Sequence, residues 1–90
     1  MEAYYQLPPH VISEKVSAET VLLNPCTGKS YTLDVIGTFI FNLLIQGNSI
    51  EQVVLEGINN FDVSKSKLRS DVTELVQQML AKGILIAKPK

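Results

Sequence analysis

The fold is decided by residues 20–47, which read TVLLNPCTGKSYTLDVIGTFIFNLLIQG. A β-branched and aliphatic run, Thr20 to Leu23, enters a turn that contains Pro25 and Gly28. Proline pre-sets the φ angle of a turn, and glycine adopts a positive φ without a steric penalty. Residues 30–33 are therefore predicted to return antiparallel to the first run, which makes a β-hairpin.

A buried helix is predicted directly after this hairpin. Asp34 can begin it, because a carboxylate accepts hydrogen bonds from the free amides of a first helical turn. The helix should continue to Ile45 and end at Gly47. Its apolar residues repeat with helical spacing and leave little of the surface polar: Val35, Ile36, Phe39, Ile40, Phe41, Leu43, Leu44 and Ile45. We expect this helix to form the middle of the core.

The residues before the hairpin give weaker signals. Val11 to Val16 is predicted to be a first strand, followed by a turn at Ser17 and Ala18. Met1 to Pro9 shows no period, and Pro8 and Pro9 argue against regular pairing there, so this segment is expected to be a loose arm. It lacks the basic start and apolar run of a signal peptide.

A second helix is predicted after Gly47. Ser49 and Gln52 have the spacing of a capping box, and the helix should end near Asn59 and Asn60. One apolar face is marked by Ile50, Val53, Val54, Ile58 and Phe61.

The third predicted helix has the clearest signature. Ser64 is its expected N-cap, Val63 can pack onto Leu68 as a hydrophobic staple, and Gly83 should end it. Its apolar stripe is Leu68, Val72, Leu75, Val76, Met79 and Leu80. Residues 84–86 could pack on the core or add a brief strand, and residues 88–90 are expected to fray into solvent.

Three short strands followed by three helices predict an α+β fold, with a small three-stranded antiparallel sheet beside a helical cluster. The arrangement is winged-helix-like with the sheet placed first. Ninety residues allow one domain, 1–90, and 46% hydrophobic residues with 19% charged residues are typical of a folded chain. The net charge of −1 gives no global attraction for nucleic acid or anionic membrane. No apolar run is long enough to cross a bilayer.

Catalytic and metal chemistry are not indicated. Cys26 and His10 are the only cysteine and histidine, too few for a zinc site, and nothing in the sequence pairs them as nucleophile and base. The five glycines never have the close spacing of a phosphate-binding loop. We therefore expect no enzyme activity, no cofactor and no metal. The single cysteine favours a reducing compartment, which predicts a cytoplasmic protein.

Two features leave room for a binding function. Lys65, Lys67 and Arg69 occupy the first turns of the third helix, where the helix dipole disfavours cations. They form either a solvated basic face, offset by Asp62, Asp71 and Glu74, or a patch for DNA phosphates or acidic peptide side chains.

The second feature is the third strand, which ends the predicted sheet. An edge strand leaves backbone groups unpaired on one side. Ser30, Tyr31 and Thr32 include no proline or charge that would block the pairing of an added strand. Alternatively, a helix or loop covers this edge.

Together these motifs resemble the PqqD-like family, also called recognition elements of ribosomally synthesised and modified peptides. The resemblance covers nearly the whole chain and is carried by Leu22-Leu23-Asn24, Thr27-Gly28, Tyr31-Thr32-Leu33-Asp34, Gly37, Ile40-Phe41, Leu43-Leu44, Gly47, Ser49-Ile50, Asp71-Val72 and Gly83-Ile84-Leu85. The chain departs from the family in having Phe41 where tryptophan is common. Its Thr-Gly hairpin is more similar to the stand-alone partners of lasso-peptide leader peptidases.

The resemblance implies a non-catalytic module that binds the leader segment of a precursor peptide and presents it to a leader peptidase or another maturation enzyme. The leader would add as a strand beside the third strand, in a cleft lined by the third helix. The implied leader-binding residues are Ser30, Tyr31, Thr32, Leu33, Asp34, Lys67, Leu68, Arg69, Asp71, Val72, Leu75, Val76 and Met79. Among them, Lys67 and Arg69 are expected to contact acidic leader residues. Some of the helix positions must be core, and helical spacing alone does not say which.

Two other functions remain open from the sequence. The fold class permits a winged-helix DNA-binding protein, although Asp71 and Glu74 lie in the same helix as the basic residues and no broad basic footprint is present. A structural subunit that covers its sheet edge with a partner protein is the third possibility.

Overall fold

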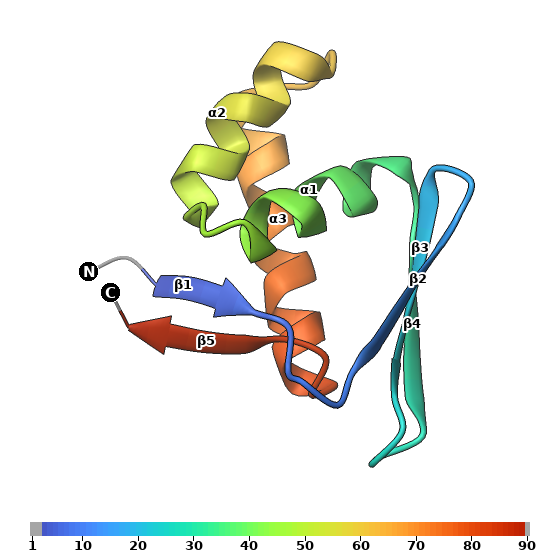
Figure 1. The fold of residues 1–90 in the computed structure, drawn as a ribbon. Coiled ribbons are helices and arrows are strands. Elements are labelled where there is room, and N and C mark those ends of the chain that lie inside the picture. Colours follow the sequence, from blue (N-terminus) through green and yellow to red (C-terminus); the bar gives the residue numbers. More distant parts are fainter. Residues whose placement is uncertain (1–2, 90) are drawn as a thin grey trace.

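A computed structural model describes residues 3–89 as two small sheets around three helices (Figure 1). The strands are β1 (Ala3–Gln6), β2 (Ile12–Val16), β3 (Glu19–Asn24), β4 (Lys29–Leu33) and β5 (Ile86–Pro89). The helices are α1 (Val35–Ile45), α2 (Ile50–Asn60) and α3 (Lys65–Ala81). The predicted α+β class with a three-stranded antiparallel sheet and three helices is confirmed. Its likeness to winged-helix proteins stays a prediction.

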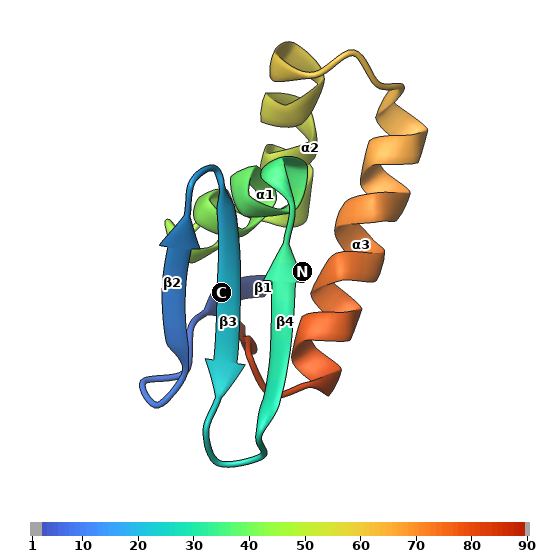
Figure 2. The same ribbon diagram turned by 90° about the vertical axis from the view of Figure 1, so that its right-hand side faces the viewer.

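The three-stranded sheet has the order β2-β3-β4 and is antiparallel throughout. In the predicted hairpin, Thr20 lies opposite Leu33 and Asn24 lies opposite Lys29. Gly28 adopts a φ of +73°, as its place in the turn requires. Figure 2 shows α1 behind this sheet and α3 beside β4, on the side away from β3.

The helix ends follow the predicted caps. The carboxylate of Asp34 accepts a hydrogen bond from the amide of Gly37 at 2.7 Å, and α1 begins at Val35, directly after this cap. Ser49 and Gln52 form both hydrogen bonds of a capping box at the start of α2. The hydroxyl of Ser64 accepts from the amide of Lys67 at the start of α3.

The prediction of a loose N-terminal arm is wrong for the described residues. β1 pairs antiparallel with β5, so that Tyr4 lies opposite Lys88 and Gln6 lies opposite Ile86. The two prolines that argued against pairing, Pro8 and Pro9, come after the strand and interrupt nothing. Residues 84–86 were expected either to pack on the core or to add a brief strand, and they do both. Ile84 and Leu85 are buried, and Ile86 begins β5.

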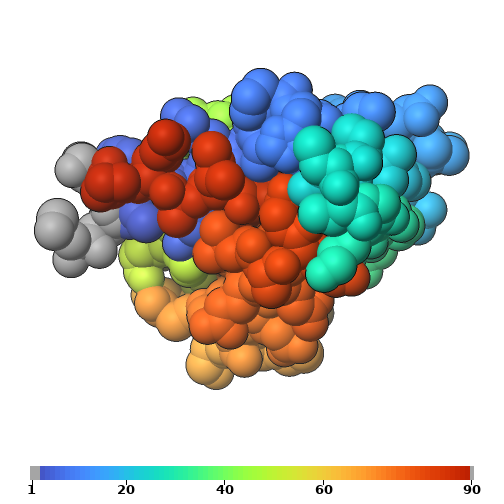
Figure 3. All heavy atoms as spheres, turned by 90° about the horizontal axis from the view of Figure 1, so that it is seen from below, coloured from blue at the N-terminus to red at the C-terminus, as the bar shows by residue number. Residues whose placement is uncertain are grey.

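The expected fraying of the C-terminus is also wrong as far as the structure describes it. Lys88 and Pro89 belong to β5, and a proline at the end of an edge strand removes no internal ladder bond. Met1, Glu2 and Lys90 lie outside the described residues. Figure 3 shows the C-terminal half of α3 between β5 and the β3–β4 hairpin.

The core is centred on α1, as predicted. Phe41 and Leu44 of this helix and Leu22 of β3 are each at most 1% exposed. The helix is less completely buried than its sequence suggested, since Val35, Ile36 and Ile45 are between 38% and 52% exposed. An apolar stripe wider than the available core leaves its margins in solvent.

Candidate functional site

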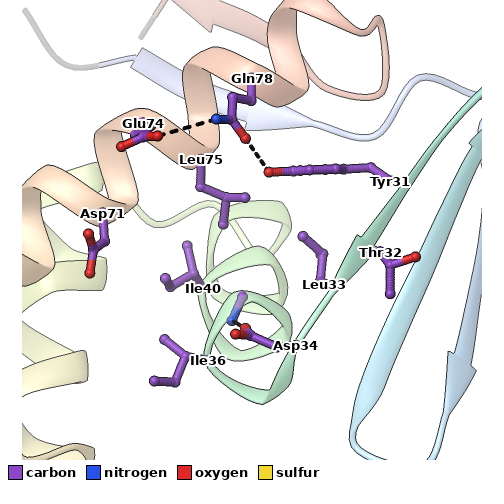
Figure 4. A pocket seen from close by; sticks show the side chains of 11 residues that line it. Tyr31, Thr32, Leu33, Asp34, Ile36, Ile40, Asp71, Glu74, Leu75 and Gln78 are labelled. Carbon is purple, nitrogen blue, oxygen red and sulfur yellow. Dashed lines mark hydrogen bonds between the residues drawn. The ribbon is translucent and has the colours of Figure 1, made fainter.

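An open hollow of about 400 Å³ lies between β4 and α3 and is called the β4–α3 groove below (Figure 4). Residues 31–34 of the strand and its helix cap form one wall. The second wall comes from α3 and consists of Asp71, Glu74, Leu75 and Gln78. The start of α1 closes the floor.

The floor of the groove is apolar. Leu33 and Ile40 are 2% and 3% exposed and belong to the core cluster, while Leu75 is half-buried against it. Ile36 is exposed, and Figure 4 places its side chain next to that of Ile40. The groove therefore offers apolar contacts to a ligand, mainly at Ile36 and Leu75.

The rim of the groove is polar. The hydroxyl of Tyr31 donates a short hydrogen bond to the amide oxygen of Gln78, which links β4 to α3 across one end of the groove. Gln78 in turn donates to the carboxylate of Glu74 at 3.3 Å. Partial burial, followed by the negative charges of Glu74 and then Asp34, raises the pKa of Tyr31 above its ordinary value. The phenol is therefore a neutral hydrogen-bonding group at physiological pH.

The direction of the backbone groups in β4 follows from the hairpin loop. The carbonyl oxygen of Asn24 accepts hydrogen bonds from the amides of Thr27 at 3.3 Å and Gly28 at 2.8 Å. The polar backbone groups of Asn24 therefore point to the side on which the chain returns as β4. Lys29, its partner in the register, faces it.

From this pair the hydrogen-bonding direction alternates along the strand. Tyr31 and Leu33 consequently turn their backbone groups toward β3, and Ser30 and Thr32 turn theirs away from the sheet. β3 is the only strand paired with β4 in the described part of the chain. The amide and carbonyl of Thr32 thus face the groove, whereas its side chain points away from the other lining residues (Figure 4).

The structure brings together six of the residues that the sequence assigned to leader binding. These six line the β4–α3 groove: Tyr31, Thr32, Leu33, Asp34, Asp71 and Leu75. Ser30 is exposed on β4 but is not part of the lining.

Four other assigned residues lie in the core. Leu68, Val72, Val76 and Met79 are at most 2% exposed and do not line the groove. The apolar stripe of α3 faces the core. Leu75, at the margin of this stripe, lines the groove together with the polar residues Asp71, Glu74 and Gln78.

The two assigned cations also lie outside the groove lining. Lys67 pairs with Asp71 one turn away, at 3.3 Å, with both side chains exposed. Arg69 forms two hydrogen bonds with Glu51 of α2, one of them 2.9 Å long, and Lys65 lies 3.8 Å from the same carboxylate. The sequence expected other acids to offset this basic face, and Glu51 was not among them.

Arg69 is expected to act on α2 rather than on a ligand. Hydrogen bonding from Arg69 is the largest cause that lowers the pKa of Glu51. Arg69→Ala should raise that pKa toward its ordinary value, which an NMR pH titration of the Glu51 carboxyl would measure. Because the lowered pKa favours the ionised form in the folded chain, the pair stabilises the fold at neutral pH and stops doing so as the pH falls through the folded-state pKa.

Lys67→Ala serves as the matched control, since Lys67 pairs with Asp71 and should leave the titration of Glu51 unchanged. A Glu51 pKa that did not move in Arg69→Ala would contradict the pairing of α2 with α3 through these side chains.

Five lining residues were missed by the sequence reasoning: Ile36, Gly37, Ile40, Glu74 and Gln78. Glu74 and Gln78 could have been found from the sequence. Glu74 lies three positions after the assigned Asp71 and Gln78 lies four positions after Glu74, so all three share one helix face. For the α1 residues no such signal existed, since the whole helix had been interpreted as core.

A family model and two solved structures are similar to this chain. A family model described as coenzyme PQQ synthesis protein D (PqqD) matches residues 19–85, from the start of β3 to the end of the buried turn after α3. The chain belongs to the PqqD family. The resemblance stated from the sequence is thereby confirmed, and the chain is a PqqD-like recognition element in fold and family.

Two solved structures are similar to this PqqD family member over nearly their whole length. One is described as TbiB1 in complex with the TbiA(beta) leader peptide; it has 25% sequence identity and a TM-score of 0.84, and the match covers 94% of this chain and 99% of that one. The other is described as lasso peptide synthetase B1 complexed with the leader peptide; it has 22% identity and a TM-score of 0.82, and the match covers 94% and 98%. No curated protein matches the sequence.

A membrane-spanning helix must be long and apolar, and a metal site needs several ligating side chains close together. None of the helices within residues 3–89 is long and apolar enough to pass through a membrane. The same residues contain no cluster of three or more potential metal-ligating side chains among histidine, cysteine, aspartate and glutamate.

Proposed function

We propose that this chain is a recognition module that binds the leader segment of a ribosomally synthesised precursor peptide. The leader adds as a strand to the free edge of β4, and its side chains enter the β4–α3 groove. The module has no catalytic role and presents the bound precursor to a leader peptidase or another maturation enzyme in the cytoplasm.

The observation that carries this proposal is the edge of β4 that no other strand within residues 3–89 pairs with, beside a groove with an apolar floor. The backbone of Thr32 offers a donor and an acceptor to an added strand, and Leu33, Ile40 and Leu75 offer apolar contacts below it. Main-chain pairing supplies affinity in this mode of recognition, and pockets for alternate side chains supply specificity. The leader peptides named in both similar solved structures support the same assignment.

Lasso-peptide maturation is the pathway class that we favour for the partner enzyme. Both similar solved structures cover almost the same length as this chain, and one is described as a lasso peptide synthetase B1. Such a module would deliver its bound peptide to a leader peptidase.

The test is a titration followed by fluorescence anisotropy. A labelled peptide with the leader sequence of the precursor encoded beside this chain is the probe, and random-sequence duplex DNA is the parallel probe. Saturable peptide binding is expected, together with DNA binding that is weak and abolished by salt, because Lys65, Lys67 and Arg69 are paired with carboxylates of the same chain. Tight DNA binding without a peptide response would overturn the proposal in favour of a winged-helix DNA reader.

A further inference from the structure

The charged residues that line the β4–α3 groove are all acidic. Asp34 lies at its α1 end, and Asp71 and Glu74 lie on α3. None of the lining residues is a lysine, arginine or histidine. This surface is the opposite of the one expected from Lys67 and Arg69.

The nearby cations neutralise this charge only in part. Lys67 is paired with Asp71 outside the lining, at 3.3 Å. Lys82, the C-cap of α3, lies 4.9 Å from the centre of the Tyr31 ring, and it forms no salt bridge with a carboxylate within residues 3–89. Within residues 3–89, neither Asp34 nor Glu74 forms a salt bridge.

Both of these carboxylates are held in place by neighbouring groups. Asp34 is fixed by its hydrogen bond to the Gly37 amide at 2.7 Å, and Glu74 accepts from Gln78 at 3.3 Å. Their field reaches the groove, because the charges of both contribute to the raised pKa of the Tyr31 phenol, which lines one end of it. An added strand between β4 and α3 would lie within this field.

We infer that the β4–α3 groove selects leader segments that carry a lysine or arginine side chain next to apolar residues. This inference rests on the proposed function and names the chemistry of its ligand. Apolar side chains of the added strand contact Leu33, Ile40 and Leu75, and the cation lies at the rim near Glu74. A strand with acidic residues at the same positions is repelled, since like charges at short range oppose binding.

A display library of random peptides tests the inference even when the precursor sequence is unknown. The full chain is immobilised, and peptides that are retained equally by Thr32→Pro protein are discarded, because they bind outside the strand edge. The remaining peptides should be enriched in lysine and arginine and depleted in aspartate and glutamate relative to the starting library.

One retained basic peptide is then titrated against Glu74→Gln and against Glu14→Gln. Glu14 lies on β2, at the other edge of the sheet, so both variants change the net charge equally while only one changes the groove. An exposed charge pair contributes about 0.2–1 kcal/mol, so Glu74→Gln should weaken binding by roughly 1.4- to fivefold and reduce its salt dependence. Glu14→Gln should leave both unchanged.

The possible failures are distinguishable. A library from which no peptide is retained would overturn the proposed function and this inference with it. Retained peptides that are neutral or acidic would leave the proposed function standing and overturn the inference alone. Equal weakening by Glu14→Gln and Glu74→Gln would also overturn it, because the effect would then come from net charge and not from the groove.

Discussion

Thr32→Pro is expected to weaken leader binding by at least about tenfold, the equivalent of roughly 1.4 kcal/mol. Proline removes the amide that Thr32 directs to the free edge of β4, and its ring projects into the space that the added strand must occupy. The partner carbonyl on the leader then loses its hydrogen bond, which alone costs about 1–3 kcal/mol when the group is buried. Fluorescence anisotropy with the labelled leader peptide would measure the change.

Folding should be affected much less than binding by this substitution. The amide of Thr32 takes no part in the β3–β4 ladder, and the side chain is exposed. Ser13→Pro is the matched control, because Ser13 is an exposed residue of β2, the other edge strand of the same sheet. Both variants should lose a similar and small amount of unfolding free energy in urea, and only Thr32→Pro should lose binding.

Tyr31→Pro tests the other edge of β4, which is paired with β3. The backbone of Tyr31 turns toward β3, where it lies opposite Leu22, so proline there removes a bond inside the sheet. We expect this variant to lose stability and binding together. Thr32→Pro protein that bound the leader normally, or that unfolded as readily as Tyr31→Pro protein, would contradict strand addition at this edge.

Most of the fold was predictable because its signals are local. The hairpin around Gly28 and the caps at Asp34, Ser49 and Ser64 each depend on residues within a few positions of one another, and the structure has all of them. The pairing of β1 with β5 was not predictable in this way. It joins two segments from opposite ends of the chain, and neither has enough alternation to indicate a strand alone.

The candidate site was only partly predictable for a related reason. Helical spacing identifies the apolar stripe of α3 but does not say how far the core extends across it, so Val72 and Leu75 looked equivalent although only Leu75 lines the groove. The basic residues at the start of α3 were assigned to the ligand for a similar reason. The partner of Arg69 is Glu51, eighteen positions away on another helix, and no local pattern connects them.

The largest loss of stability is expected from Phe41→Ala. Phe41 is 1% exposed in the centre of the core, and truncation of a buried phenylalanine to alanine typically removes about 3–5 kcal/mol. That is a large fraction of the roughly 5–15 kcal/mol by which a domain of this kind is stable. Urea denaturation followed by circular dichroism would measure the lowered midpoint.

Phe39→Ala provides the control, because the same atoms are removed from a half-buried ring. Phe39 packs edge-to-face against Phe61 with ring centroids 5.0 Å apart, so its loss should be real but smaller. Equal losses in the two variants would contradict the placement of Phe41 at the centre of the core.

Saturating leader peptide should restore part of the stability that Phe41→Ala removes. A ligand that binds only the folded chain adds about 2.7 kcal/mol of stability at a hundred times its dissociation constant. Phe41 does not line the β4–α3 groove, so the truncated protein retains the strand edge and the apolar floor that the leader uses. Thr32→Pro protein should show the reverse pattern, with a nearly normal midpoint that the same peptide raises clearly less. Core and groove are thus separable by one denaturation series with and without peptide, and a peptide that raised both midpoints equally would show that it binds elsewhere than at β4.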